Sequence, residues 1–216
     1  MKNPRPFILL ILVIATAAGA CRSSGGTAGP QIVQPGAPGQ PSRVISPDMA
    51  VDLSPVKHTA ADVRFMQGMI GHHAQAIEMT DLLATRTQRE DMRKLAQRID
   101  VSQTDEIRMM QEWLKQRGEA LPDPHAHHHG GTLMPGMLSA QEMSRLADAK
   151  GEAFDRLFLE FMIKHHEGAL VMVQELLATP GAGQEPEIFA FANDVDADQR
   201  MEIDRMRAML DKLKEH

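Results

Sequence analysis

The sequence contains one pattern of histidines and methionines twice. Residues 69–79 read MIGHHAQAIEM and residues 162–172 read MIKHHEGALVM, at an offset of 93 positions. After a three-residue insertion, the residues around Glu106 match those around Glu202 at an offset of 96. Because two segments repeat in the same order, a duplicated helix hairpin is the economical explanation.

Helical periodicity supports this interpretation, because apolar residues recur at three- and four-residue spacing in each repeated segment. We expect helices over about 59–85 and 92–117 in the first unit, and over 139–178 and 187–213 in the second. The helix over 139–178 is expected to bend at Gly151. No segment predicts a strand.

Two helices begin at sequences typical of capping boxes, namely TAAD from Thr59 and SAQE from Ser139. In such a box the N-cap hydroxyl and an acidic side chain three residues later bond each other's backbone. Asp62 is thereby explained as a capping residue, whereas its equivalent Asp155 falls inside a continuing helix. Two hairpins packed together predict an all-α four-helix bundle with approximate two-fold symmetry.

The N-terminus is typical of an exported protein. Residues 1–20 combine two cations with an apolar run too short for a confident membrane span, which predicts a signal peptide. The small residues before Cys21, AGAC, resemble a bacterial lipobox, so we expect Cys21 to carry lipid on a periplasmic or outer-envelope lipoprotein. Ordinary cleavage leaving a soluble secreted protein is the alternative.

Residues 21–57, rich in Gly, Pro and Ser, predict a flexible tether before a bundle over residues 58–216. With 43% apolar residues the chain can form one sizeable core. The single cysteine excludes an internal disulfide. A formal net charge of -6 argues against nucleic acid as a partner.

The repeated histidines are the strongest sign of function. A single buried histidine is more often a core residue with both nitrogens satisfied, and buried methionines commonly fill gaps in a core. Two His-His pairs at equivalent positions of two units instead favour a metal site. They are His72, His73, His165 and His166.

The carboxylates Glu106 and Glu202 interrupt apolar stripes, where an unpaired charge costs several kcal/mol by order of magnitude. They are therefore expected to be paired, protonated or at the bundle mouth, and a simple ion pair is the alternative to a metal role. Four-helix carboxylate bundles hold two iron or manganese ions with two Glu and two Glu-x-x-His motifs. Here Met69-x-x-His72 and Met162-x-x-His165 replace that motif, and a thioether favours copper, above all Cu(I), with silver as a mimic.

The doubled pattern D-x-x-F-x-x-x-M-I-x-H-H-x-x-A-x-x-M, with the segment MPGMLSAQEMSRLADAKGEAFDRLFLEFMIKHHEGALVM, resembles the bacterial family called domain of unknown function 305 over about Ala60 to Leu213. The resemblance implies a ferritin-like four-helix bundle, export and, in some relatives, copper binding, but no known enzyme activity. The candidate metal ligands are Met69, His72, His73, Met79, Met162, His165, His166 and Met172, with Met110, Met206, Glu106 and Glu202 as additions.

A second candidate metal site lies in the expected loop over 118–138, whose HAHHH tract contains His125 and His127, His128 and His129. Such clustered imidazoles bind Cu(II), Zn(II) or Ni(II) without a fold, or are simply solvated.

These observations together predict an exported protein that binds copper as Cu(I) or Cu(II) and buffers or transfers it. The alternatives are a ferritin-like oxidoreductase with two iron or manganese ions, and a structural or interaction bundle. The expected partners are the metal ion and a lipid anchor; a copper donor or acceptor protein and a second copy of the chain are left open.

Overall fold

The computed structural model describes residues 31–34, 41–52, 56–122 and 133–214, in two compact units divided after Asp52. In the first unit, strands β1 (Ile32–Gln34) and β2 (Arg43–Ile45) pair antiparallel and precede α1 (Pro47–Val51). The sequence predicts no strand, and this prediction is wrong for residues 32–34 and 43–45. The three-residue strands are too short to give the period-two pattern from which a strand is predicted.

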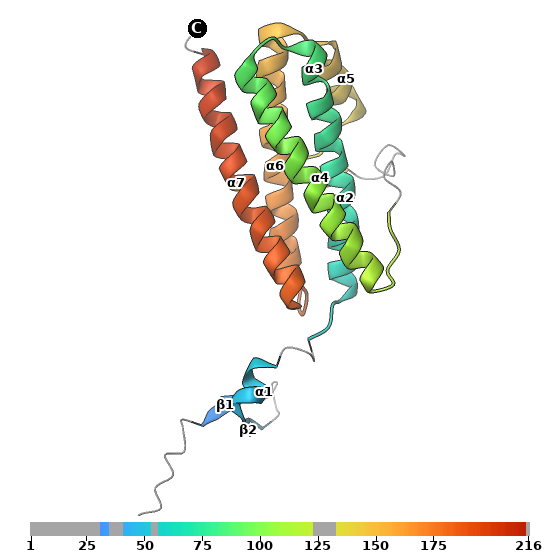
Figure 1. The fold of residues 1–216 in the computed structure, drawn as a ribbon, viewed down its shortest axis with the longest axis vertical. Coiled ribbons are helices and arrows are strands. Elements are labelled where there is room, and N and C mark those ends of the chain that lie inside the picture. The colour runs from blue at the N-terminus through green and yellow to red at the C-terminus, as the bar shows by residue number, and fades with distance from the viewer. Residues whose placement is uncertain (1–30, 35–40, 53–55, 123–132, 215–216) are drawn as a thin grey trace, which may run out of the picture. The chain divides into compact units, whose positions relative to one another are not determined.

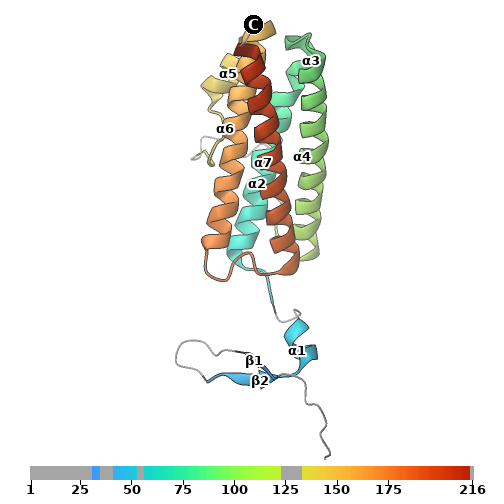
Figure 2. The ribbon, with the colours of Figure 1, turned by 90° about the vertical axis from the view of Figure 1, so that its left-hand side faces the viewer.

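The second unit contains four long helices arranged as two hairpins (Figure 1; Figure 2). The first hairpin pairs α2 (Ala60–Asp81) with α4 (Glu90–Gln116), joined through α3 (Leu83–Arg86). The second pairs α6 (Gly151–Ala178) with α7 (Pro186–Lys214), after the short α5 (Ala140–Asp148). Contact between α2 and α6 joins the hairpins, which confirms the predicted all-α four-helix bundle.

Helix ends follow the local sequence signals. Both capping boxes are present, with the Thr59 hydroxyl accepting from the Asp62 amide and the Ser139 hydroxyl from the Glu142 amide. Gly118, with φ 71°, ends α4 in a Schellman turn in which the amide of Glu119 donates to the carbonyl of Leu114. At Gly151, with φ 59°, the expected bend is a break between α5 and α6.

The core of the bundle consists of two apolar clusters that the duplication relates to each other. One contains Met69, Met110 and Met172, and the other contains their repeat equivalents Met162, Met206 and Met79. In α2, the apolar residues before the histidine pair belong to the first cluster and those after it belong to the second. In α6 the order is reversed. The histidines therefore lie between two apolar ends. In the described part of the chain, no helix is long and apolar enough to cross a membrane.

Candidate metal centre

A layer of polar side chains crosses the bundle halfway along its length. Each long helix contributes two residues to this polar layer, and all eight are at most 7% exposed. Its members are His72 and His73 from α2, Gln103 and Glu106 from α4, His165 and His166 from α6, and Gln199 and Glu202 from α7. The duplication thus places equivalent polar groups from all four helices at one level of the core.

In each hairpin, one histidine is held by a carboxylate. His73 Nε2 lies 2.5 Å from Glu106 Oε2, and His166 Nε2 lies 2.6 Å from Glu202 Oε2. The hydroxyl of Ser102 donates to the other oxygen of Glu106 at 3.4 Å. The expectation that these glutamates are paired is therefore confirmed, and their partners are the repeated histidines.

The other two histidines contact each other across the bundle. The ring centroids of His72 and His165 are 3.8 Å apart. Burial, and then the neighbouring His73, lower the pKa of His72 to about 3. Burial and the neighbouring His72 place the pKa of His165 well below its ordinary value. Both rings are therefore neutral at pH 7, and each keeps one nitrogen lone pair.

Hydrogen bonding identifies the nitrogen that carries this lone pair. His72 Nε2 lies 3.0 Å from the carbonyl of Pro135, which only accepts, so Nε2 carries the proton and Nδ1 is the acceptor. His165 bonds the backbone of His72 and leaves Nε2 without a partner. In His73 and His166 the Nε2–H donates to the carboxylate, and Nδ1 has no hydrogen-bond partner among the described residues.

Five buried polar atoms of the layer have no hydrogen-bond partner among the described residues. Besides the four ring nitrogens, Gln103 Oε1 is a buried acceptor with no donor in the described part of the chain. A buried polar atom without a partner costs about 1–3 kcal/mol. Several lone pairs without a donor in one layer fit a cation and do not fit an anion. A histidine that binds a metal also commonly donates its other N–H to a carboxylate or carbonyl, as all four of these rings do.

The structure does not gather all the predicted ligands into one site. The six candidate methionines are at most 8% exposed and lie in the apolar clusters on either side of the polar layer. Among the described residues, no three His, Cys, Asp or Glu side chains form a group ready to hold an ion. The imidazoles and carboxylates are thus assembled in the layer, with thioethers flanking it on both sides.

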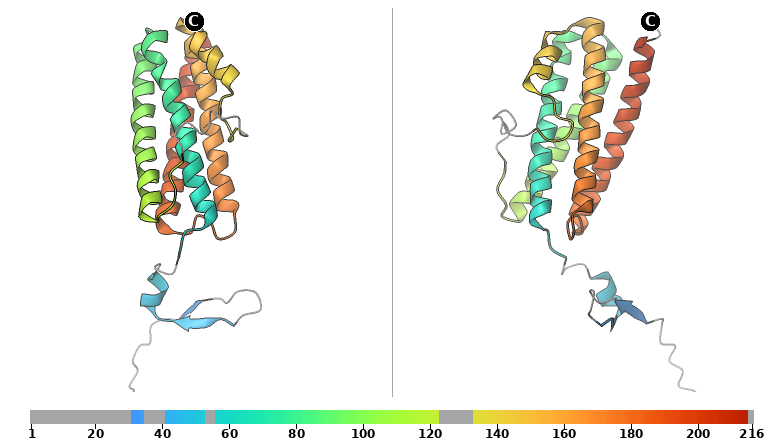
Figure 3. Two further views of the ribbon diagram at one scale, coloured as in Figure 1. Left: turned by 90° about the vertical axis from the view of Figure 1, so that its right-hand side faces the viewer. Right: turned by 180° about the vertical axis from the view of Figure 1, so that it is seen from behind.

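Sequence reasoning missed the segment that covers His72. Residues 134–138, here called the strap, cross between α2 and α6 before α5 begins (Figure 3). Gln75 fixes the strap by donating to the carbonyl of Leu138 at 2.9 Å and accepting from its amide at 2.7 Å. A Cβ at Gly168 would lie 2.0 Å from the Pro135 carbonyl oxygen, so only glycine permits this approach. The signals for it were the Pro-Gly pair of the strap and a glycine inside a helix.

The acidic pair Asp62 and Asp155 has a structural role. Asp62 Oδ1 accepts from the amide of Gly183, in the turn between α6 and α7, at 2.7 Å. The Asp155 carboxyl is hydrogen-bonded to the side chain of Thr87, in the turn before α4, and burial raises the pKa of this carboxyl. Each aspartate therefore ties its own hairpin to the turn of the other.

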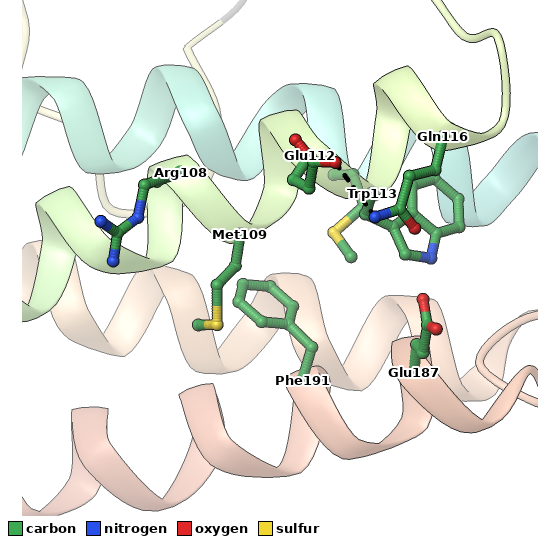
Figure 4. Close-up of a pocket in the computed structure, with 8 residues that line it drawn as sticks. Arg108, Met109, Glu112, Trp113, Gln116, Glu187 and Phe191 are labelled. Atoms are coloured by element: carbon green, nitrogen blue, oxygen red, sulfur yellow. Dashed lines mark hydrogen bonds between the residues drawn. The ribbon is translucent and has the colours of Figure 1, made fainter.

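A separate cavity of about 500 Å³ lies between α4 and α7 and contains no imidazole in its lining. Figure 4 shows Met109 and Trp113 from α4 and Phe191 from α7 in its wall, with Glu187 near one end. The predicted lipidation site Cys21 and the loop histidines His125, His127, His128 and His129 lie outside the described residues.

Comparison with known proteins agrees with this architecture. The model of a family described as Domain of unknown function (DUF305) matches residues 62–210. A DUF305 fragment from Deinococcus radiodurans is 33% identical, with a TM-score of 0.63 over 72% of this chain and 98% of that one. A DUF305 protein from Streptomyces coelicolor, thought to be secreted, is 29% identical, with a TM-score of 0.61 over 71% and 94%.

A third similar structure is CopM in its Cu(II)-bound form, which is 28% identical, with a TM-score of 0.59 over 70% of this chain and 96% of CopM. CopM has also been solved with Cu(I) and with silver. A search of the curated proteins finds no match. The family match covers more than half of the sequence and includes both repeated His-His segments, so this chain belongs to the DUF305 family.

Proposed function

We propose that this protein binds copper in the cell envelope and buffers or transfers it, with the imidazoles of the polar layer as its principal ligands. The observation that carries the proposal is a set of four buried ring nitrogens, one each on His72, His73, His165 and His166, that have no hydrogen-bond partner among the described residues. Imidazole suits copper, iron, nickel and zinc, so the surroundings must decide among these metals.

The flanking sulfurs favour copper. Met69 and Met162 each precede a histidine pair by three residues, which places the thioether one helical turn from the imidazole. Thioethers are soft ligands that favour Cu(I) over iron and manganese. The structures of CopM with Cu(I), Cu(II) and silver support the same class of cargo.

In this proposal Glu106 and Glu202 orient the ligands rather than bind the ion. Each carboxylate accepts from Nε2 of a histidine, which fixes the ring and leaves Nδ1 without a hydrogen-bond partner among the described residues. This role departs from the ligand role expected from the sequence. A ferritin-like iron or manganese oxidoreductase requires the carboxylates to leave the histidines and bind metal instead.

Metal analysis of the protein purified without a His tag separates the candidates. Copper near stoichiometry supports the proposal, iron or manganese supports the oxidoreductase, and a metal-free protein that stays unchanged on copper addition supports a structural bundle.

The double variant His73→Ala/His166→Ala then tests the site. Its apo form should lose more than the roughly 1–3 kcal/mol per site that the cavities cost, because Glu106 and Glu202 also lose their histidine partners, and the rise in Tm that copper produces in wild type should be absent. A full copper-induced rise in the variant would show that these histidines are core residues.

In this proposal the protein is exported to the cell envelope and is anchored there by lipid on Cys21. The histidine tract over 125–129 binds copper first, before the ion reaches the bundle. Deleting residues 125–129 should therefore slow copper uptake without changing the final affinity of the bundle. Loss of tight binding on this deletion would move the principal site to the loop.

A further inference from the structure

Two open grooves lie between α4 and α7, one toward each end of the bundle from the polar layer. The first is the cavity of about 500 Å³ at Trp113, and the second measures about 700 Å³ and lies at Met209. Seven lining positions of the first groove have their repeat equivalents, at the offset of 96, in the lining of the second. The duplication therefore produced the same groove twice on one surface, here called the α4–α7 face.

The two grooves differ in charge. In the first groove Glu112 and Glu187 outnumber Arg108. In the second groove four bases outnumber two acids, namely Lys94, Arg98, Arg205 and Lys212 against Asp91 and Asp204. The α4–α7 face therefore has an acidic end and a basic end.

Along α7 the same difference in charge follows a single stripe. Its residues recur at alternating spacings of four and three, which is typical of helices that pack side by side. From the N-terminal end the stripe reads Glu187, Phe191, Asp194, Asp198, Met201, Arg205, Ala208 and Lys212, of which six line a groove. Burial, and then the carboxylates of Glu106 and Glu202, raise the pKa of Asp198, so the middle of the stripe also lies beside α4. The acids of the stripe thus precede its bases.

The groups of this face have few contacts within one chain. Met109 and Met201, at the two grooves, are 51% and 62% exposed. Asp194 and Arg205 are exposed and have no ion-pair partner among the described residues. Close contacts join α2 to α4, α6 to α7 and α2 to α6, but not α4 to α7. The surface is therefore apolar in its grooves and carries charges that are free to pair with another molecule.

We propose that two copies of this chain pack with their α4–α7 faces together and their helices antiparallel, with the two-fold axis at the level of the polar layer. This arrangement places the acidic end of each face on the basic end of the other, whereas a parallel arrangement places like charges together. On α7 the reversed stripe sets Glu187 opposite Lys212 of the second copy, Asp194 opposite Arg205, and Phe191 opposite Ala208.

The face is large enough for a stable dimer. The stripe over 187–212 is roughly 40 Å long at 1.5 Å per residue, and two helices side by side are roughly 20 Å wide. Such a face has an area of roughly 800 Å² per copy, which is the size of a standard interface. The dimer would also cover Glu106 and Glu202, which at 6% and 7% are the most exposed members of the polar layer.

Analytical ultracentrifugation of the Cys21→Ala chain, in the presence of a chelator, tests the proposal. The mass should rise from one chain to two as the protein concentration rises. Adding Asp194→Arg or Arg205→Asp should weaken the dimer about tenfold or more, because each change sets like charges together at two symmetric places. The double variant Asp194→Arg/Arg205→Asp restores opposite charges and should dimerise within about threefold of the parent chain.

Matched charge reversals on the opposite side of the bundle serve as controls. Arg64→Glu and Glu175→Arg alter exposed residues of α2 and α6 and should dimerise as the parent chain does. A single-chain mass at every concentration would overturn the proposal, and so would a dimer that neither reversal weakens or that the double variant does not restore. Because the measurement uses metal-free protein, its failure leaves the proposed copper binding untouched.

Discussion

His166 Nε2 lies 2.6 Å from Glu202 Oε2, and the duplication reproduces this contact between His73 and Glu106. The same carboxylate–imidazole pair thus occurs twice in a buried layer, each time leaving Nδ1 of the histidine without a partner among the described residues. The pair explains why a glutamate interrupts the apolar stripe of α4 and of α7.

Replacing both carboxylates should weaken copper binding while leaving the fold intact. In Glu106→Gln/Glu202→Gln the side-chain volume is kept, but the ring loses its charged acceptor and its fixed orientation. Loss of such an orienting partner typically lowers metal affinity about 10–100-fold. Competition with a Cu(I) chelator measures the change, and Glu112→Gln, on the exposed face of α4, should bind as wild type does. Complete loss of binding would instead indicate that the carboxylates are ligands.

The metal-free bundle should lose stability in mild acid. The folded-state pKa of His72 is about 3, below the ordinary 6.5, so the native state binds fewer protons than the unfolded chain. The part of the free energy of unfolding that depends on the neutral His72 ring is fully present above about pH 6.5. It is lost as the pH falls toward 3, at about 1.4 kcal/mol per pH unit for each such group. His165 adds an effect of the same sign.

Urea unfolding of the chelator-treated protein between pH 7.5 and 4 checks this dependence. The free energy of unfolding should fall more steeply in wild type than in His72→Asn/His165→Asn. Equal slopes in the two proteins would show that the two histidines do not supply the dependence.

Two helix-interior glycines should respond oppositely to alanine. In Gly168→Ala the new Cβ would lie 2.0 Å from the Pro135 carbonyl oxygen, so the strap must move, at a cost of about 1–3 kcal/mol or more. In Gly71→Ala the new Cβ meets Met134 Cε at an ordinary 3.6 Å, and the gain in helix propensity is up to about 1 kcal/mol. Thermal unfolding gives the signs, and hydrogen exchange should show faster exchange of the Leu138 amide only in Gly168→Ala. Protection of that amide in both variants would contradict the role of the strap.

Cys21→Ala tests the lipid anchor. Wild type should partition with membranes of the expressing bacterium, and the variant should be released into the soluble envelope fraction. If both proteins are soluble, ordinary signal cleavage is the correct interpretation.

The fold could be predicted because its signals are local. Capping sequences at Thr59 and Ser139, the glycine at 118 and the stripe periodicity each act within a few residues. The duplication also identified the histidines and glutamates of the polar layer. What the sequence could not predict are contacts between distant segments, such as His72 with the carbonyl of Pro135, 63 residues away. The acceptor there is a backbone carbonyl, which every residue has, so the residue type does not indicate the contact.

The crossed aspartate contacts make each half of the bundle dependent on the other. Asp62 of the first hairpin binds the turn of the second at Gly183, and Asp155 of the second binds the turn of the first at Thr87. In a hairpin expressed alone, the aspartate has no turn of the other hairpin to bind, and the turn has no aspartate to bind it. Two copies of that hairpin would supply both, so the architecture corresponds to a symmetric homodimer whose two subunits have become one polypeptide.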